Sequence, residues 1–224
     1  MYKTIIHGDS LEEMKKIPDA SIDAVITDPP YFMMAHYISQ GDGGKKRRRW
    51  SDASILQAWW KQLCNEFERL LKPSGHVIVF CNADSYPAFF IPMYERFTTI
   101  NCLVWDKTTP GLGTMWRRQH EMIIAARHSK SYRPPPKCSK PDILKHKIVP
   151  AKRRRHPVEK PVELLKELVE HATPEGGTVL DPFAGGGSCL MAADELKRSY
   201  IGIEMEEDYI DIIRERLPDA KTSL

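Results

Sequence analysis

The sequence predicts an α/β fold built on an open, mostly parallel β-sheet, and three observations favour this class. Short β-branched and apolar runs alternate with segments of helical periodicity along most of the 224 residues. The runs at 22–26 and 178–180 each lead to an acid and a turn, as strands do at the ligand-binding edge of such sheets. Two further runs, 100–105 and 121–126, flank a Pro-Gly connection, and this hairpin would supply one antiparallel strand.

The composition is that of a globular protein, with 42% hydrophobic and 28% charged residues. No apolar run approaches the ~18 residues of a membrane span, and the N-terminus lacks the apolar stretch of a signal peptide. The five cysteines are scattered and form no C-x-x-C pair, which argues against a disulfide framework or a metal site. We therefore expect one domain over residues 1–224, in a reducing cytoplasm, without a membrane or a metal.

Positive charge is concentrated in clusters, while the net charge of +3 is too small to indicate a partner. The clusters are formed by Lys45, Lys46, Arg47, Arg48 and Arg49, by Arg117 and Arg118, and by Arg153, Arg154 and Arg155. Dense basic clusters are typical of surfaces that contact a polyanion such as nucleic acid, although many are simply solvated. Charge alone leaves both interpretations open.

Two segments lack the periodicity of helices and strands. Residues at about 32–50 are glycine-rich and basic, and they follow directly on the acidic corner after the strand at 22–26. We expect a lid that orders on a polyanion, with a decorative loop as the alternative. Residues at about 128–155 are rich in proline, lysine and arginine and have few large apolar groups, so they cannot form a core. This stretch is predicted to be an extended surface segment and a candidate target-recognition segment.

The first half of the chain divides into regular elements at clear signals. Ser10 is a candidate N-cap, with Glu13 as its capping-box partner, for a helix that Pro18 ends. Ile55 opens an apolar stripe of helical period along the strongest helix, and a Pro-Ser-Gly turn separates that helix from the next strand. The elements expected in this half are strands at 4–6, 22–26 and 76–80 and helices at 10–17, 54–71 and 84–96.

The last third is regular as well. Val162, Leu165, Leu168 and Val169 share one face of a helix, and a turn at 174–177 precedes the next strand. The elements expected here are helices at 161–171, 189–196 and up to about 217, strands at 178–180 and 200–203, and a glycine loop at 181–188. A strand, a glycine-rich turn, a helix, a strand and a final acid form a nucleotide-type βαβ half.

The first acidic corner consists of Asp28, Pro29, Pro30 and Tyr31. Proline cannot donate a backbone hydrogen bond and restricts the preceding residue to extended geometry, so the corner is stiff and rich in free carbonyls. A carboxylate, carbonyls and an aromatic ring suit a planar heterocycle that bears an amino group. The alternative is a turn with a hydrogen-bonded Asp28 and a packed Tyr31.

The glycine loop differs from two common nucleotide-binding loops. Gly185 and Gly187 match the first two positions of G-x-G-x-x-G, but Leu190 takes the third, and no Gly-Lys-Ser/Thr follows. Glu204 follows Asp181 at about the 20-residue spacing of an acid that binds ribose hydroxyls. An acid at position 181 repels a pyrophosphate but can pair with an ammonium. These features favour an adenosyl ligand that carries an amino acid.

Residues 181–188 resemble the S-adenosylmethionine loop of DNA amino-methyltransferases, and residues 28–31 resemble their catalytic motif. The order of the two motifs is similar to that of the circularly permuted β group of adenine-N6 and cytosine-N4 DNA methyltransferases. Segments 8–10, 105–107 and 156–161, and the pair His120 and Glu121, also resemble that group. The resemblance implies a Rossmann-like methyltransferase sheet, mostly parallel with one antiparallel strand, in circularly permuted motif order.

The resemblance also implies the cofactor and its contacts. The residues expected around S-adenosyl-L-methionine are Asp9, Asp28, His156, Lys160, Asp181, Phe183, Ala184, Gly185, Gly187, Ser188 and Glu204. Asp181 would face the methionine part, Glu204 the ribose hydroxyls and Asp9 the adenine amino group. For Asp9 the alternative is a helix-capping acid, and for Lys160 it is a solvated helix start.

The expected reaction is transfer of a methyl group to the N6 amino group of adenine in double-stranded DNA. Asp28 would accept one amino hydrogen and the Pro29 carbonyl the other, while Tyr31 stacks on a base flipped out of the duplex. Phe32 and Trp116 are secondary aromatic candidates. Cytosine-N4 methylation stays open, and methylation of a protein glutamine is a more distant alternative. The resemblance implies a prokaryotic or phage-encoded cytoplasmic enzyme and leaves open a homodimer and a cognate restriction nuclease.

Overall fold

The computed structural model describes residues 2–30, 53–113, 115–128 and 140–223. Tyr31, Phe32 and the basic cluster Lys45, Lys46, Arg47, Arg48 and Arg49 lie outside the described residues. The strands are β1 Lys3–His7, β2 Ile22–Thr27, β3 Leu71–Cys81, β4 Thr98–Asp106, β5 His120–Arg127, β6 Ile143–Lys145, β7 Thr178–Asp181, β8 Ser199–Glu204 and β9 Lys221–Ser223. The helices are α1 Ser10–Met14, α3 Ala53–Leu70, α4 Tyr86–Arg96, α5 Val162–Ala172, α6 Ser188–Glu195 and α7 Glu207–Arg216, with a 3₁₀ turn at Ala151–Arg153.

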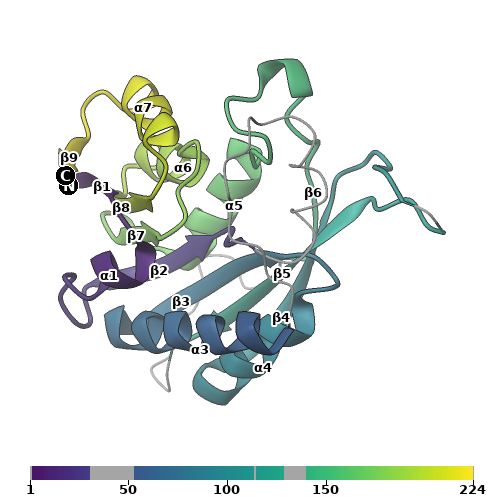
Figure 1. The fold of residues 1–224 in the computed structure, drawn as a ribbon, viewed down its shortest axis with the longest axis horizontal. Coiled ribbons are helices and arrows are strands. Elements are labelled where there is room, and N and C mark those ends of the chain that lie inside the picture. Colours follow the sequence, from purple (N-terminus) through teal and green to yellow (C-terminus); the bar gives the residue numbers. More distant parts are fainter. Residues whose placement is uncertain (1, 31–52, 114, 129–139, 224) are drawn as a thin grey trace.

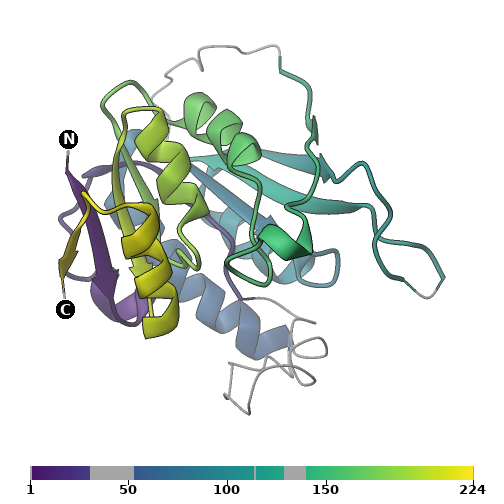
Figure 2. The ribbon, with the colours of Figure 1, turned by 90° about the horizontal axis from the view of Figure 1, so that it is seen from above.

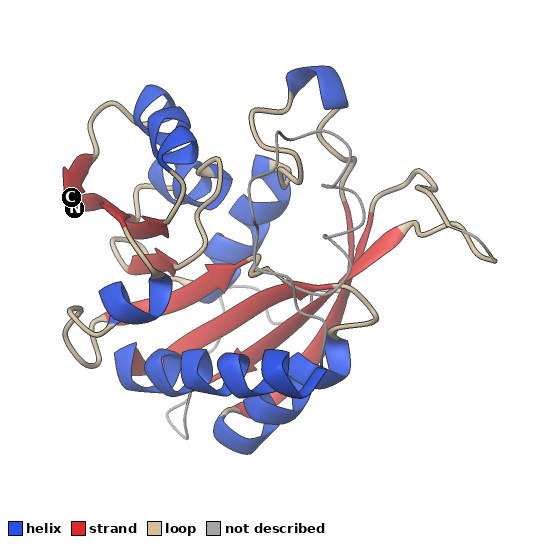
Figure 3. Cartoon of the chain, viewed as in Figure 1, coloured by secondary structure: helices blue, strands red, loops and turns tan. Residues whose placement is uncertain are grey.

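The described strands form a single sheet in the order β6-β4-β5-β3-β2-β7-β8-β1-β9. β5 runs antiparallel to both of its neighbours, β3 and β4, and the other pairings are parallel. The prediction of a mostly parallel sheet with one antiparallel strand is therefore confirmed. Figure 3 shows the strands fanning out between two groups of helices.

Helices cover both faces of the sheet (Figures 1 and 2). On one face α1, α3 and α4 pack over a cluster that includes Met14, Trp60 and Phe89. On the opposite face α5, α6 and α7 pack over a second cluster, which includes Leu164 and Leu190. Because both faces are covered, the central strands are largely apolar, and all six residues of β2 are buried, including Asp23 and Thr27.

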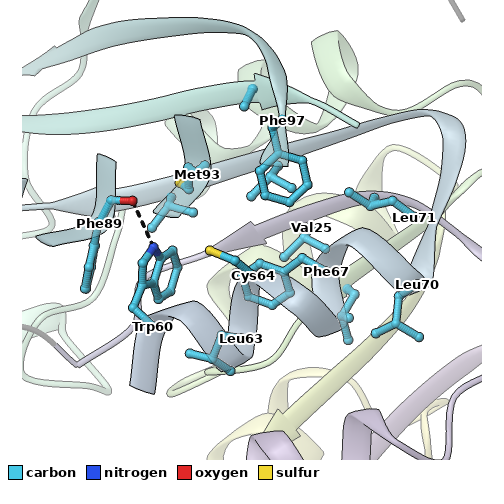
Figure 4. Packing of buried hydrophobic residues seen from close by; sticks show 14 of the residues in the cluster. Val25, Trp60, Leu63, Cys64, Phe67, Leu70, Leu71, Phe89, Met93 and Phe97 are labelled. Carbon is cyan, nitrogen blue, oxygen red and sulfur yellow. Dashed lines mark hydrogen bonds between the residues drawn. The ribbon is translucent and has the colours of Figure 1, made fainter. Parts of the chain in front are cut away.

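The core beneath α3 and α4 contains aromatic side chains packed among aliphatic ones (Figure 4). The Trp60 ring stacks on Phe89 at a centroid distance of 4.3 Å, and its indole N–H donates to the Phe89 carbonyl at 3.0 Å. The sequence prediction placed Ile55 on the buried stripe of this helix, and this is wrong because Ile55 is exposed. Leu56 is buried instead, one position further along the helix.

Further expectations from the sequence also differ from the structure. Asp9, not Ser10, is the N-cap of α1, and its Oδ1 accepts the N–H groups of Leu11 and Glu12. The Pro-Ser-Gly run at 73–75 does not separate a helix from a strand, because β3 begins at Leu71 and the run bulges out between its two stretches of pairing with β2. Two short strands at the sheet edges, β6 and β9, were not predicted, and β6 incorporates part of segment 128–155 into the sheet.

Candidate active site

The two motifs found in the sequence meet where the strand order of the sheet reverses. β2 and β7 are hydrogen-bonded neighbours, and the chain leaves β2 toward β3 but leaves β7 in the opposite direction, toward β8. The carboxyl ends of the strands at such a switch point form the ligand-binding crevice of open α/β sheets. Asp28 follows β2 and Asp181 ends β7, so both acids lie at this place.

The glycine loop after β7 is a tight backbone turn. Gly185 and Gly187 have φ angles of +51° and +80°, which side chains other than glycine rarely adopt. The N–H of Gly187 donates to the Ala184 carbonyl at 2.8 Å, and the N–H of Ala184 donates to Ile203 of β8 at 3.0 Å. Ser188 then begins α6 and is buried. The loop therefore presents backbone, with few side chains, at the switch point.

The neighbouring strands β7 and β8 each end in an acid, of which Asp181 is buried and Glu204 is partly buried. Asp181 accepts hydrogen bonds at Oδ1 from Thr27 at 2.8 Å and from the N–H of Phe183 at 3.1 Å. Burial raises the pKa of Asp181 to about 7, although both hydrogen bonds oppose the rise. Glu204 accepts the N–H of Gly185 at 2.7 Å, and burial raises the pKa of Glu204 as well.

Other predicted cofactor contacts lie within the glycine loop or beside it. Phe183 packs on Trp59 of α3, with ring centroids 5.6 Å apart, and Ala184 is buried. A hydroxyl hydrogen bond from Ser10 to the Pro182 carbonyl ties α1 to the loop. Asp9 lies beside Ser10 and caps α1, which is the alternative considered for it. Its predicted contact with adenine stays a prediction.

A segment before α5 covers the loop from outside. An added Cβ at Gly185 would lie 3.4 Å from Nε2 of His156, so the imidazole lies against the loop. Glu159 holds this segment, because it accepts the N–H of Arg155 at 2.7 Å and an Nη2–H of Arg216 at 2.7 Å. Arg216 also donates to the Gly186 carbonyl at 2.7 Å. The sequence had placed Glu159 only within the resembling segment 156–161, and it did not predict Arg216, because no local pattern marks this contact between helix α7 and the loop.

Lys160 is buried, with 6% of its surface exposed, and it is not the solvated helix start considered for it. Its ammonium donates to Oδ2 of Asp28 and lies 3.3 Å from Oε2 of Glu121 on β5. Lys107, which follows β4, reaches the other oxygen of Glu121 at 2.6 Å. We call these four residues the ion cluster. The sequence had placed Glu121 and Lys107 only in segments that resemble the methyltransferase group.

The charges of the ion cluster shift one another. Burial raises the pKa of Asp28, and Lys160 offsets this only in part. Burial would lower the pKa of Lys160, but Asp28 and Glu121 outweigh it, so that pKa is raised. Burial opposes ionisation of Glu121 too, but Lys160 and Lys107 prevail and lower its pKa. Glu121 is therefore the firmly ionised acid of the cluster, and Asp28 is the one that more readily takes a proton.

The predicted DNA-binding arginines divide into two kinds. Arg117 donates to the Gly111 and Pro110 carbonyls, Arg118 pairs with an acid on the neighbouring loop, and Arg154 donates to two carbonyls of its own segment. Arg155 pairs with Glu215. Arg153 is exposed on the 3₁₀ turn and has no partner among the described residues. The structure leaves the DNA contact of all five as a prediction.

Within the described ranges, no group of His, Cys, Asp and Glu side chains is arranged to hold a metal ion. The helices in that part of the chain are all too short or too polar to cross a membrane.

Comparison with known proteins identifies the family. Residues 22–215 match the N6/N4 methyltransferase family, described as DNA methylase. YubD of Escherichia coli (strain K12) is 32% identical over 221 residues, which cover 98% of this chain and 92% of YubD. The DNA adenine methyltransferase YhdJ of the same organism is 28% identical over 256 residues, covering 97% of this chain and 83% of YhdJ.

A solved structure shares the fold. The crystal structure of the M1.HpyAVI–SAM complex superposes with a TM-score of 0.74 at 22% identity and covers 97% of this chain and 99% of the other. From the family match and the relatives together, the chain belongs to the N6/N4 family of DNA methylases.

Proposed function

We propose that the protein transfers a methyl group from S-adenosyl-L-methionine to the exocyclic N6 amino group of adenine in double-stranded DNA. One observation carries the proposal. Asp28 lies at the switch point beside the glycine loop, and its Oδ1 is buried without a hydrogen-bond donor among the described residues. A buried carboxylate oxygen without a donor is costly, so this oxygen suits a ligand that brings an N–H group.

The residues around the loop fit the proposed cofactor. Asp181 accepts both of its hydrogen bonds at Oδ1, so Oδ2 can accept from the ammonium of the methionine part. Oε1 of Glu204 accepts the backbone N–H groups of Met205 and Glu206, whereas Oε2 accepts only that of Gly185 and has a remaining lone pair for a ribose hydroxyl. Gly185, Gly187 and Ser188 supply backbone at close range, and His156 bounds the loop from outside. Bound S-adenosylmethionine would supply an electrophilic methyl group.

The protein's part in the reaction is to make a poor nucleophile better. The lone pair of an exocyclic amine is delocalised into the ring. Asp28 and the Pro29 carbonyl would each accept one amino hydrogen, which favours a pyramidal nitrogen with a localised lone pair. These hydrogen bonds strengthen as the nitrogen becomes positively charged, so they stabilise the transition state more than the ground state. Tyr31 would stack on the flipped base, an interaction worth ~1–3 kcal/mol.

Adenine is the favoured base because the Asp-Pro-Pro-Tyr motif resembles the one that is commoner among adenine enzymes than among cytosine enzymes. The relative YhdJ, which is named a DNA adenine methyltransferase, supports the same choice. The family covers both N6 and N4 enzymes, so cytosine-N4 is the second candidate.

The test is to incubate the protein with methyl-labelled S-adenosylmethionine and unmethylated DNA, and to identify the labelled nucleoside by mass spectrometry. We expect N6-methyladenine, and sequencing of the product then locates the modified sites. Asp28→Ala should abolish labelling while calorimetry still detects cofactor binding. Labelled N4-methylcytosine would move the proposal to its second candidate. Full activity of Asp28→Ala would contradict the role given to this acid.

A further inference from the structure

The ion cluster contains one more acid than methyl transfer by Asp28 needs. Lys160 is buried between Asp28 and Glu121, and Glu121 is in turn bound by Lys107 at 2.6 Å. Its members come from the ends of the three strands β2, β4 and β5 and from the segment before α5. The contact therefore does not arise from sequence proximity. Removing charges from water is costly, and a buried lysine stays charged only when carboxylates compensate it. Such an arrangement calls for a role in the site.

The two oxygens of Asp28 have different environments. Oδ2 accepts from Lys160, whereas Oδ1 is buried and has no donor among the described residues. The side chain as a whole keeps 19% of its exposure, so a ligand can approach it from one side. Lys160 thus fixes the rotation of the carboxylate and determines which oxygen is left for a ligand.

We propose that Lys160 and Glu121 are a positioning pair for Asp28, in which Lys160 orients the acid toward the target amine and Glu121 holds Lys160 when Asp28 takes up a proton. The inference rests on the proposed function and goes beyond it by giving roles to two residues outside the Asp-Pro-Pro-Tyr motif. It also replaces the expected contact of Lys160 with the cofactor, since its ammonium is directed at two carboxylates.

The proton balance explains why a second acid is useful. Methylation forms a bond from the target nitrogen to the methyl carbon, and the breaking S–C bond leaves its electron pair on sulfur. The nitrogen must then release one of its two original protons. Asp28 is the nearest base and becomes a neutral carboxylic acid, which deprives Lys160 of one charge partner. Glu121 remains ionised because Lys160 and Lys107 stabilise its charge, so the ammonium stays in place.

Titratable groups face Asp28 from each strand that packs around it. Lys160 lies before α5, Glu121 on β5 and Lys107 after β4, while Asp181 lies on β7 and Cys81 on β3. Among them Lys160 favours ionised Asp28 most, and Glu121 opposes it. Changes at Lys160 and at Glu121 should therefore move the titration of Asp28 in opposite directions. A pair that served only packing would produce no such opposition.

The test is a carboxyl-carbon NMR titration of protein labelled with ¹³C-aspartate, without cofactor or DNA. The Asp28 signal is assigned by its absence in Asp28→Asn. In Lys160→Met the midpoint for Asp28 should rise by about one to three pH units, and in Glu121→Gln it should fall. Lys166→Met is the matched control. Lys166 lies in α5 and also pairs with two carboxylates, but neither belongs to the ion cluster, so this variant should leave the Asp28 midpoint unchanged.

Lys160→Met leaves Asp28 without its charge partner and Glu121 with Lys107 alone, and the variant could fail to fold. Lys160→Arg keeps the charge and should leave the midpoint near that of the wild type. The double variant Lys160→Met with Glu121→Gln removes one charge of each sign and should give an intermediate midpoint. Midpoints that agree in all variants, or that shift in the same direction in both single variants, would overturn the proposal.

A second readout connects the pair to methylation. Ionised Asp28 is the stronger acceptor and can take up the released proton, which the neutral acid cannot, so the acidic limb of the pH profile of the single-turnover rate should follow the Asp28 midpoint in each variant. A limb that stays fixed while the midpoint moves would overturn the catalytic part of the inference. If wild-type protein methylates no DNA at all, the proposed function fails and takes that catalytic part with it. The titration would still decide whether Lys160 and Glu121 control Asp28.

Discussion

Thr27 donates a hydrogen bond of 2.8 Å to Asp181, and this buried contact joins residues 154 positions apart in the chain. It links the last residue of β2, directly before Asp28, to the acid that begins the glycine loop. The two motifs identified in the sequence therefore face each other across adjacent strands. A methyl donor held by the loop would lie on the same edge of the sheet as the acid at position 28.

Thr27→Val tests this link, because valine keeps the shape of threonine and removes its hydroxyl donor. Asp181 would lose a hydrogen bond that favours its ionised form, so affinity for S-adenosylmethionine at pH 7 should fall about tenfold. Calorimetry measures the change. Thr178→Val at the opposite end of β7 is the control and should bind normally. Equal affinity in Thr27→Val and wild type would show that this hydrogen bond does not prepare Asp181 for the ligand.

The raised pKa of Asp181 leads us to expect that cofactor binding depends on pH. Its pKa of about 7 lies far above the ordinary value of 3.8, so below pH 7 the free protein keeps this acid protonated. An ammonium favours the ionised acid, and binding there should release a proton, so affinity rises as the pH increases from about 5.5 to 8. Calorimetry in buffers of different ionisation enthalpy counts the protons. Asp181→Asn should release about one proton fewer, and an unchanged proton count would contradict the assignment.

The same shift affects stability in the opposite sense to most acids. Between pH 3.8 and about 7 the unfolded chain ionises Asp181 while the folded protein keeps it protonated. The unfolded state therefore binds fewer protons, and the contribution of Asp181 to the free energy of unfolding falls as pH rises through this range. Denaturant unfolding should show Asp181→Asn gaining stability relative to wild type from pH 4 to 8. A constant difference across that range would contradict the raised pKa.

Arg216 and Glu159 should support the cofactor site from outside. Arg216→Met removes the donor that ties the Gly186 carbonyl to Glu159, and the segment carrying His156 loses its anchor. We expect cofactor affinity to fall about tenfold, with a loss of stability of about 1–3 kcal/mol. Arg214→Met, on the same helix, removes only exposed ion pairs and should change neither quantity by much. Identical behaviour of the two variants would exclude a special role for Arg216.

Local patterns predicted most of the fold and the centre of the site. The strands β2 and β7 were predicted from runs of β-branched residues that end in an acid. The glycine loop was predicted from its glycine pattern and from its spacing to Glu204. The strands β6 and β9 were missed because three residues are too few to show a period. Ile55 was misassigned because consecutive isoleucine and leucine residues leave the buried face of a helix ambiguous by one position.

The ion cluster could not be predicted in the same way. Glu121 is a single acid at the start of a strand, and nothing in its neighbourhood indicates that Lys160 will face it across the sheet. Its partner is set by the strand order, which places β5 beside β3 and turns the start of β5 toward the edge where β2 ends. Burial of a lysine between two carboxylates is a property of that arrangement, and no single segment encodes it.

Arg153 and Arg154 offer a matched test of DNA contact. Arg153 is exposed and lacks a partner in the described part of the chain, whereas Arg154 donates to the Val149 and Pro157 carbonyls. Arg153→Gln should weaken DNA binding and reduce the slope of log affinity against log salt by about 0.9, without loss of stability. Arg154→Gln should lower stability. An unchanged salt slope in Arg153→Gln would mean that this residue is simply solvated.

The hairpin between β4 and β5 projects from the edge of the sheet that carries the ion cluster (Figure 1). Trp116 lies on it with 83% of its surface exposed, and Arg117 ties the hairpin together through the Gly111 and Pro110 carbonyls. An exposed tryptophan on a braced hairpin suits stacking on a base or insertion between base pairs.

Trp116→Ala should therefore weaken DNA binding about tenfold, in line with ~1–3 kcal/mol for one stacked base, and leave the salt slope unchanged because no charge is removed. Fluorescence anisotropy with labelled duplex at several salt concentrations measures both quantities. Tyr94→Ala is the control, since Tyr94 is another exposed aromatic side chain, 69% exposed, and it stacks on Phe90 of helix α4. Equal losses in the two variants would assign the effect to general surface chemistry. No loss in Trp116→Ala would place the hairpin outside the DNA interface.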